Sequence, residues 1–120
     1  MKKKKNGFRF KFQKKSFAIG DCQICKSIFS KTIGLMFKKN PKNLLFVFQK
    51  PVKISIHSFF CRKNFVAIWL LNGRVIDAKI VLPWKLNLAP RKNFDKLLEL
   101  PFNDTKEISK FSSLLERFKY

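Results

Sequence analysis

The pair Asn72-Gly73 lies between two apolar segments and constrains the fold more than any other feature of the chain. Both central positions of a two-residue hairpin turn need positive φ angles, which asparagine and glycine tolerate best. Phe65–Leu71, before the pair, is apolar without interruption, as expected of a strand that is buried on both faces. Arg74–Leu82 follows the pair and is stopped by Pro83. The sequence therefore predicts a buried β-hairpin.

Further extended segments recur at short intervals. Phenylalanines alternate with cations over Phe8–Phe12, the period of a half-buried strand. The other candidates are Ser16–Ile24 after a turn at Gln13-Lys14-Lys15, Leu44–Phe48 between turns at Asn40-Pro41 and Lys50-Pro51, the alternating Lys53–Cys61, and Lys96–Leu100 before Pro101. Short strands without long helices between them favour a sandwich or barrel. We predict an all-β (β-rich) fold: a single jelly-roll-like β-sandwich or barrel of short, mostly antiparallel strands, with one or two short helices.

Two segments have helical signals. Ser27–Ile33 has the pattern of a short helix, and Gly34 is placed to end it. Asp104 can cap a second helix, because Glu107 three residues later completes a capping-box pattern. Ile108 and Phe111 of that helix would face the core. The pattern leaves open whether Leu114–Phe118 continues the helix or forms a last strand.

The length and composition indicate one domain. The 120 residues include 15 phenylalanines and 2 tryptophans, which is ample for one core. We expect a disordered cationic tail at 1–7 and a single β domain at 8–120. No apolar run approaches the roughly 20 residues that a bilayer requires. Basic residues such as Arg9 and Lys11 interrupt the stretch where a signal peptide would be apolar. The expectation is a cytoplasmic monomer without a membrane span.

The charge is strongly positive, with 27 Lys and Arg against 7 Asp and Glu, a net +20. Such a charge points to a polyanion such as RNA or DNA. Few of the cations are arginine, however, and arginine is preferred for bidentate contacts to phosphate and guanine. Abundant Lys, Asn, Phe and Ile are also what an AT-rich genome produces. The charge therefore indicates nucleic acid as one partner class without selecting it.

The three cysteines permit a metal-site hypothesis. Cys22 and Cys25 form a C-x-x-C pair, and His57 with Cys61 could complete four ligands. On an extended chain, residues three apart point to opposite faces. The second pair is four residues apart, which spans about 13 Å on a strand. We therefore expect buried, unreactive thiols, with a metal-binding protein through these four residues as an alternative. No bound cofactor is predicted.

Catalytic patterns are weak. Ser55 and His57 would stand side by side on a strand, about 6.6 Å apart, without the directed hydrogen bond of a nucleophile–base pair. The acids are scattered, and the four glycines form no phosphate-binding loop. The sequence favours a protein that is not an enzyme.

Several stretches together are more specific. They are Gly34–Lys38 (GLMFK), Leu44–Phe48 (LLFVF), Ser55–Phe60 (SIHSFF), Trp69-Leu70, Gly73–Asp77 (GRVID), Pro83-Trp84 and Leu98–Pro101 (LELP). In order and spacing they resemble the family called domain of unknown function 192, particularly its archaeal branch, from about Phe17 to Asn103. The resemblance implies a jelly-roll-like β-sandwich and no known reaction.

By motif match, the resemblance makes Met36, Lys38, Ser55 and His57 the candidate binding residues. The chain departs from the family where Pro, an aliphatic residue and Asp would precede the buried strand, since it has Asn64-Phe65-Val66 there. The family's C-terminal Gly-Asp is also missing. The lost acid removes a partner for His57 or Lys38, which weakens a catalytic reading.

Three functions follow as hypotheses. The leading one is a non-enzymatic binding or interaction module, with RNA or DNA as a possible polyanionic partner. The second is an enzyme of unknown reaction whose pocket contains His57 and Lys38. The third is the metal-binding protein.

Overall fold

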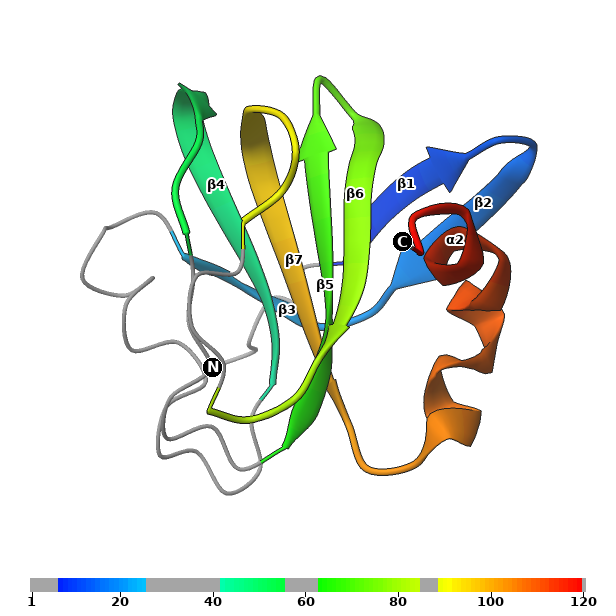
Figure 1. The fold of residues 1–120 in the computed structure, drawn as a ribbon. Coiled ribbons are helices and arrows are strands. Elements are labelled where there is room, and N and C mark those ends of the chain that lie inside the picture. Colours follow the sequence, from blue (N-terminus) through cyan, green and yellow to red (C-terminus); the bar gives the residue numbers. More distant parts are fainter. Residues whose placement is uncertain (1–6, 26–41, 56–62, 85–88, 120) are drawn as a thin grey trace, which may run out of the picture.

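Seven strands and two short helical segments make up the described part of the chain in a computed structural model, which describes residues 7–25, 42–55, 63–84 and 89–119 (Figure 1). In chain order the elements are β1 (Phe8–Phe12), β2 (Lys15–Ile19), β3 (Cys22–Cys25), β4 (Asn43–Val52), β5 (Asn64–Leu71), β6 (Arg74–Val81), β7 (Phe94–Phe102), the 3₁₀ helix η1 (Thr105–Phe111) and the helix α2 (Ser112–Arg117).

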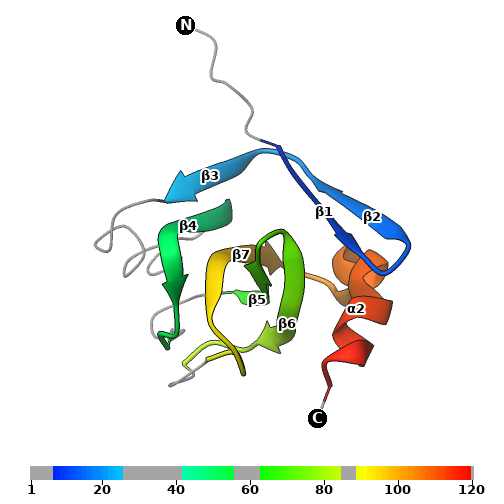
Figure 2. The ribbon, with the colours of Figure 1, turned by 90° about the horizontal axis from the view of Figure 1, so that it is seen from above.

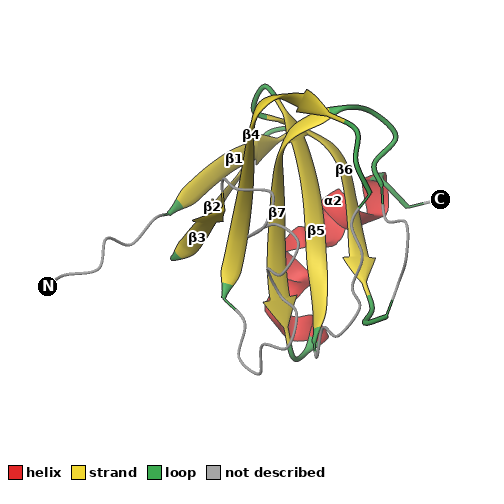
Figure 3. Cartoon of the chain, turned by 90° about the vertical axis from the view of Figure 1, so that its left-hand side faces the viewer, coloured by secondary structure: helices red, strands yellow, loops and turns green. Residues whose placement is uncertain are grey.

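The strands form one sheet in the order β2-β1-β6-β5-β7-β4-β3, which curls strongly so that its two ends approach each other (Figures 1 and 2). Most neighbouring strands are antiparallel. Two pairs of strands are parallel: β3 with β4, and β1 with β6, where only the residues Lys11 and Arg74 are paired. Both helices lie against one side of the sheet (Figure 3). The prediction of a β-rich fold of mostly antiparallel strands is confirmed.

Both faces of the sheet are buried, in two separate clusters. The first core contains Phe10, Phe17, Ile19, Cys22, Leu45, Val66, Ile68, Leu70, Ala78, Leu98, Leu100, Phe102, Ile108, Phe111 and Leu114. The second core contains Cys25, Leu44, Phe46, Phe65, Ala67, Trp69, Val81, Phe94 and Leu97. Because successive strand residues alternate in direction, β5 supplies both cores in turn. This confirms that β5 is a strand buried on both sides.

The hairpin between β5 and β6 turns at Asn72 and Gly73, whose φ angles are 50° and 79°. These positive angles confirm the turn that the sequence predicts. The Asn72 N–H donates to Asp95 Oδ2 at 3.2 Å, which ties the turn to the start of β7. Gln13, with a φ of 55°, also lies in the left-handed region and opens the turn between β1 and β2.

Two prolines predicted to end strands do not end them. β4 continues through Pro51, and its pairing with β7 shifts register between Val47 and Val52. β3 pairs only with the first four residues of β4, so no described strand lies on that side of Pro51. Proline lacks an N–H, and at this unpaired edge no hydrogen bond to a neighbouring strand is lost. β7 likewise passes through Pro101, beyond the last residue of β7 that pairs with β4. These two strand ends were wrongly predicted.

Other boundaries also differ. The predicted segment Ser16–Ile24 is divided by a bend at Gly20-Asp21, where Asp21 has a φ of 52°, into β2 and β3. The predicted strand Lys53–Cys61 is wrong at its start, because 53–55 belong to no strand. Its remainder lies outside the described residues, as does the helix predicted at Ser27–Ile33.

The C-terminal segment is helical. Asp104 Oδ1 accepts the Lys106 N–H at 3.0 Å, and Glu107 Oε2 accepts the Asn103 N–H at 2.9 Å, so both predicted capping side chains bind the backbone. Ile108 and Phe111 point into the first core, as predicted. The open question about 114–118 is answered by α2, which makes most of that segment helical.

Asp104→Ala should lower the free energy of unfolding by about 1 kcal/mol, because a free N–H of the first helical turn loses its acceptor. Asp104→Asn keeps an acceptor and should lose less. Urea denaturation followed by circular dichroism measures both; equal losses would contradict the capping role.

Candidate functional site

Of the four candidate binding residues, the structure describes Ser55 alone. Ser55 follows β4, is exposed and belongs to no strand. Met36, Lys38 and His57 lie outside the described residues. The role of these four as binding residues therefore stays a prediction.

Cys22 and Cys25 stand on opposite faces of β3. Cys22 belongs to the first core and Cys25 to the second, and both are free thiols. Burial, and then the neighbouring carboxylate of Asp21, raise the pKa of the Cys22 thiol, which disfavours the thiolate that metals and electrophiles need. Within the described ranges no three His, Cys, Asp or Glu side chains gather as a metal group. His57 and Cys61, the other proposed ligands, lie outside those ranges.

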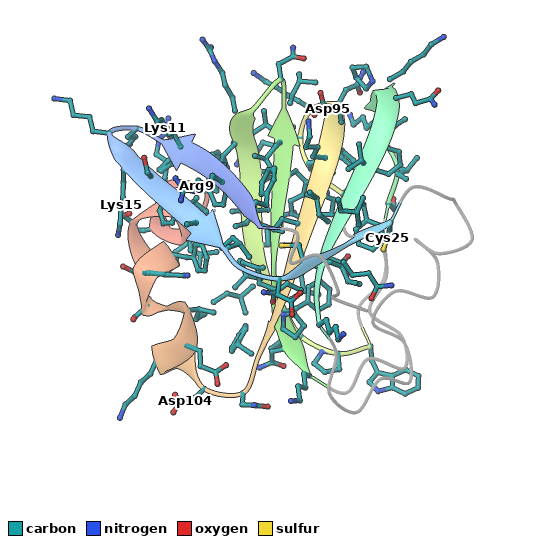
Figure 4. All side chains as sticks on the ribbon, turned by 180° about the vertical axis from the view of Figure 1, so that it is seen from behind. Arg9, Lys11, Lys15, Cys25, Asp95 and Asp104 are labelled. Atoms are coloured by element: carbon teal, nitrogen blue, oxygen red, sulfur yellow. The ribbon has the colours of Figure 1, made fainter. Side chains whose placement is uncertain are left out.

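The β1–β2 hairpin has one apolar and one cationic face. In the antiparallel register Arg9 lies opposite Ala18, and Lys11 lies opposite Ser16; all four are exposed. The intervening pair, Phe10 and Phe17, points the other way into the first core. Ala18 and Ser16 are too small to cover the two cations, which Figure 4 labels on the hairpin.

This cationic surface extends across the sheet. Arg74, the first residue of β6, pairs with Lys11, and Lys14 occupies the exposed turn of the hairpin. We call Arg9, Lys11, Lys14 and Arg74 the hairpin face. No Asp or Glu occurs in either hairpin strand. Four cations without a neighbouring acid in the hairpin make this face attractive to an anion.

Lys15 is used differently. Its ammonium lies 5.2 Å from the centre of the Phe17 ring and donates to the Lys110 carbonyl at 3.2 Å. The side chain thus fastens the hairpin to η1, and the hairpin face rests on the helical layer beneath it.

Two buried acids were missed by the sequence reasoning. Asp77 and Glu99 lie opposite Trp69 and Ala67 of β5, on the side of the second core. Desolvation raises the pKa of Glu99 to about 8, so its carboxyl is largely protonated at neutral pH. The Asp77 Oδ1 accepts the Ala78 N–H at 2.9 Å. The signal for Glu99 was its position inside an apolar run, Leu97–Leu100.

A lysine and a tryptophan adjoin these acids. The Lys79 ammonium is 5.8 Å from the centre of the Trp69 ring and donates to the Ala89 carbonyl at 3.3 Å. The Trp69 Nε1–H is buried without an acceptor among the described residues. A protonated carboxyl and a buried N–H are donors, so this part of the second core can hydrogen-bond an acceptor.

No helix in the described ranges is long and apolar enough to cross a membrane.

Comparisons with known proteins identify relatives of the fold. No family model matches the chain. A transcription-regulator candidate from Sinorhizobium meliloti has a crystal structure that superimposes with a TM-score of 0.71 at 12% identity, covering 87% of this chain and 84% of that one. A protein of unknown function from Novosphingobium aromaticivorans also gives 0.71 at 12% identity, covering 90% and 76%. At this identity the likeness shows the fold alone.

A sequence relative is more specific. A UPF0127 protein of Pyrococcus horikoshii is 33% identical over 85 residues, which span 68% of this chain and 73% of the relative. The name of this relative states no reaction, in keeping with the absence of a catalytic pattern in the sequence. On this identity and coverage, the chain belongs to the UPF0127 family.

Proposed function

We propose that this protein is a non-enzymatic binding module that takes up a polyanion, RNA or DNA, on its hairpin face. The observation that carries the proposal is the row of exposed cations formed by Arg9 and Lys11 on β1 and Arg74 on the adjoining β6, beside small or like-charged neighbours. Cations held on a sheet lose less freedom on binding than cations on a tail.

The chemistry of the face favours phosphate contacts over base reading. Lysine acts as a point charge, and Arg9 and Arg74 are the two arginines on the surface in question. Phosphate contacts fix position and carry no sequence information. The expected binding is therefore strong at low salt and weakly dependent on sequence. The description of one structural neighbour as a transcription-regulator candidate makes DNA the first probe.

The family assignment has a finer form. We propose that UPF0127 corresponds to the domain of unknown function 192 that the GLMF and SIH segments resemble, and that the chain is of its archaeal branch, in keeping with the Pyrococcus relative. A cytoplasmic monomer fits the proposed role.

Removing two cations from the hairpin face should weaken DNA binding and its dependence on salt. In fluorescence anisotropy with a short mixed-sequence duplex, the affinity of the unaltered chain should fall steeply between about 50 and 200 mM salt. The double variant Lys11→Gln/Lys14→Gln should reduce the slope of log K against log salt by about 2, because each lost phosphate contact removes about 1.

The matched control is Lys50→Gln/Lys53→Gln, which removes the same charge from exposed positions at the end of β4. This control should leave the slope unchanged. Equal losses in both variants would mean that the charge acts diffusely and that the hairpin face is not the site. Absence of binding at low salt would refute the proposal altogether.

A further inference from the structure

A groove of about 560 Å³ lies between β6 and the C-terminal helices. Ala78, Lys79 and Ile80 border it on the strand side, and Ile108, Leu115 and Phe118 form an apolar wall on the helical side. Its volume is in the range of ligand-binding pockets, and its lining is mostly apolar. Figure 2 shows α2 beside β6 and below the β1–β2 hairpin.

The groove follows the edge of β6. Successive strand residues point to opposite faces of the sheet, so a groove over one face would be bordered by alternate residues only. Ala78, Lys79 and Ile80 all border this groove, which therefore runs along the edge of the strand. The Lys79 ammonium confirms this, because it lies over Trp69 on the side of the second core, away from Ala78. β6 pairs with β5 along its length, whereas on its other side β1 pairs with it at Arg74 alone.

The end of this edge near Ile80 is apolar and open. Ile80 is 47% exposed, and Leu82, just beyond the strand, is 48% exposed. Leu115 and Phe118 across the groove are half-buried. The Ala78 N–H already donates to Asp77 Oδ1 and is not available to a new strand. An added strand would therefore pair with β6 farther along, around Ile80. An extended chain placed there finds backbone groups on one side and apolar surface on the other.

The charge selects the occupant. Lys79 and Lys119 border the groove, Arg74 stands at the start of β6, and Glu116 is the one acid among the described residues that line it. A second copy of this chain carries +20 itself and is repelled. We propose that the edge of β6 accepts an extended segment of a partner protein in which apolar residues alternate with acids. The segment adds as a strand beside Ile80 and inserts its apolar side chains toward α2.

The probe is a labelled synthetic peptide of alternating valine and glutamate, titrated into the full chain and followed by fluorescence anisotropy. We expect saturable binding that weakens at least tenfold when alternate backbone nitrogens of the peptide are methylated, since these no longer donate to a strand edge. A valine–lysine peptide should not bind. Binding that survives methylation would overturn strand addition and indicate a ligand held by apolar contact alone.

Ile80→Lys places a cation in the apolar part of the edge and should lower the affinity at least tenfold. Ile54→Lys is the matched control, because Ile54 is 43% exposed outside the groove and the added charge is the same. Equal affinities in the two variants would place the peptide elsewhere. The methylated peptide decides the question even if Ile80→Lys fails to fold. Lys11→Gln/Lys14→Gln should leave peptide binding intact, which separates this site from the DNA-binding proposal.

Discussion

Phe17→Ala should lower the free energy of unfolding by about 3–5 kcal/mol. The Phe17 ring is 3% exposed and lies in the middle of a stack of three rings. Its centre is 5.0 Å from that of Phe10, with an interplanar angle of 11°, and 5.4 Å from that of Phe111, with an angle of 14°. The substitution removes buried area and leaves a cavity between the hairpin and η1. Urea denaturation followed by circular dichroism measures the loss.

Phe8→Ala is the control for this prediction. Phe8 is half-buried at the margin of the same core, with its ring centre 6.0 Å from that of Phe10. Its loss should cost about 1 kcal/mol, in proportion to the smaller buried area. If the two variants lose equal stability, the ring stack does not hold the hairpin. A destabilised Phe17→Ala protein should also bind DNA more weakly, because the hairpin face depends on this stack for its support.

Glu99→Gln should make the protein more stable at alkaline pH and leave its stability nearly unchanged at acid pH. The pKa of Glu99 is about 8 in the folded protein against an ordinary value of 4.5. The neutral carboxyl favours the folded state, so its contribution is complete below about pH 4.5 and is lost as the pH rises to about 8. Glutamine stays neutral throughout. The difference between the proteins should grow to a few kcal/mol above about pH 8.

Urea denaturation of both proteins at a series of pH values tests this prediction, because other titrating groups affect the two proteins alike. Glu116→Gln, at an exposed position of α2, is the matched control and should follow the unaltered protein at every pH. Parallel stability curves for Glu99→Gln and the unaltered protein would show that Glu99 is already charged, and so hydrated or paired, at neutral pH.

The sequence predicted the local elements where one physical signal dominated. The alternation in β1, the uninterrupted apolar run of β5 and the Asn72-Gly73 turn each allow essentially one conformation. Two of the wrong strand ends came from prolines. Pro51 and Pro101 remain within strands because the neighbouring strand has ended or shifted beside them, and the length of a neighbour is a tertiary property.

The candidate sites were harder to predict. The hairpin face was visible in the sequence as alternating cations, but its continuation to Arg74 depends on a parallel pairing between distant strands. Glu99 was missed because its charge suggests a surface position, whereas the sheet buries it between strands on both sides. The opposite directions of Cys22 and Cys25 followed from strand geometry alone and were predicted correctly.

The stack of Phe10, Phe17 and Phe111 also bears on how the chain folds during synthesis. The β1–β2 hairpin leaves the ribosome before the other strands, yet one of the rings on which Phe17 packs belongs to η1, which follows all seven strands. Until η1 emerges, the Phe17 ring lacks Phe111 as a packing partner, and a two-stranded ribbon is marginal by itself. The β1–β2 hairpin is therefore expected to stay loosely folded, and open to chaperones, until η1 has been synthesised.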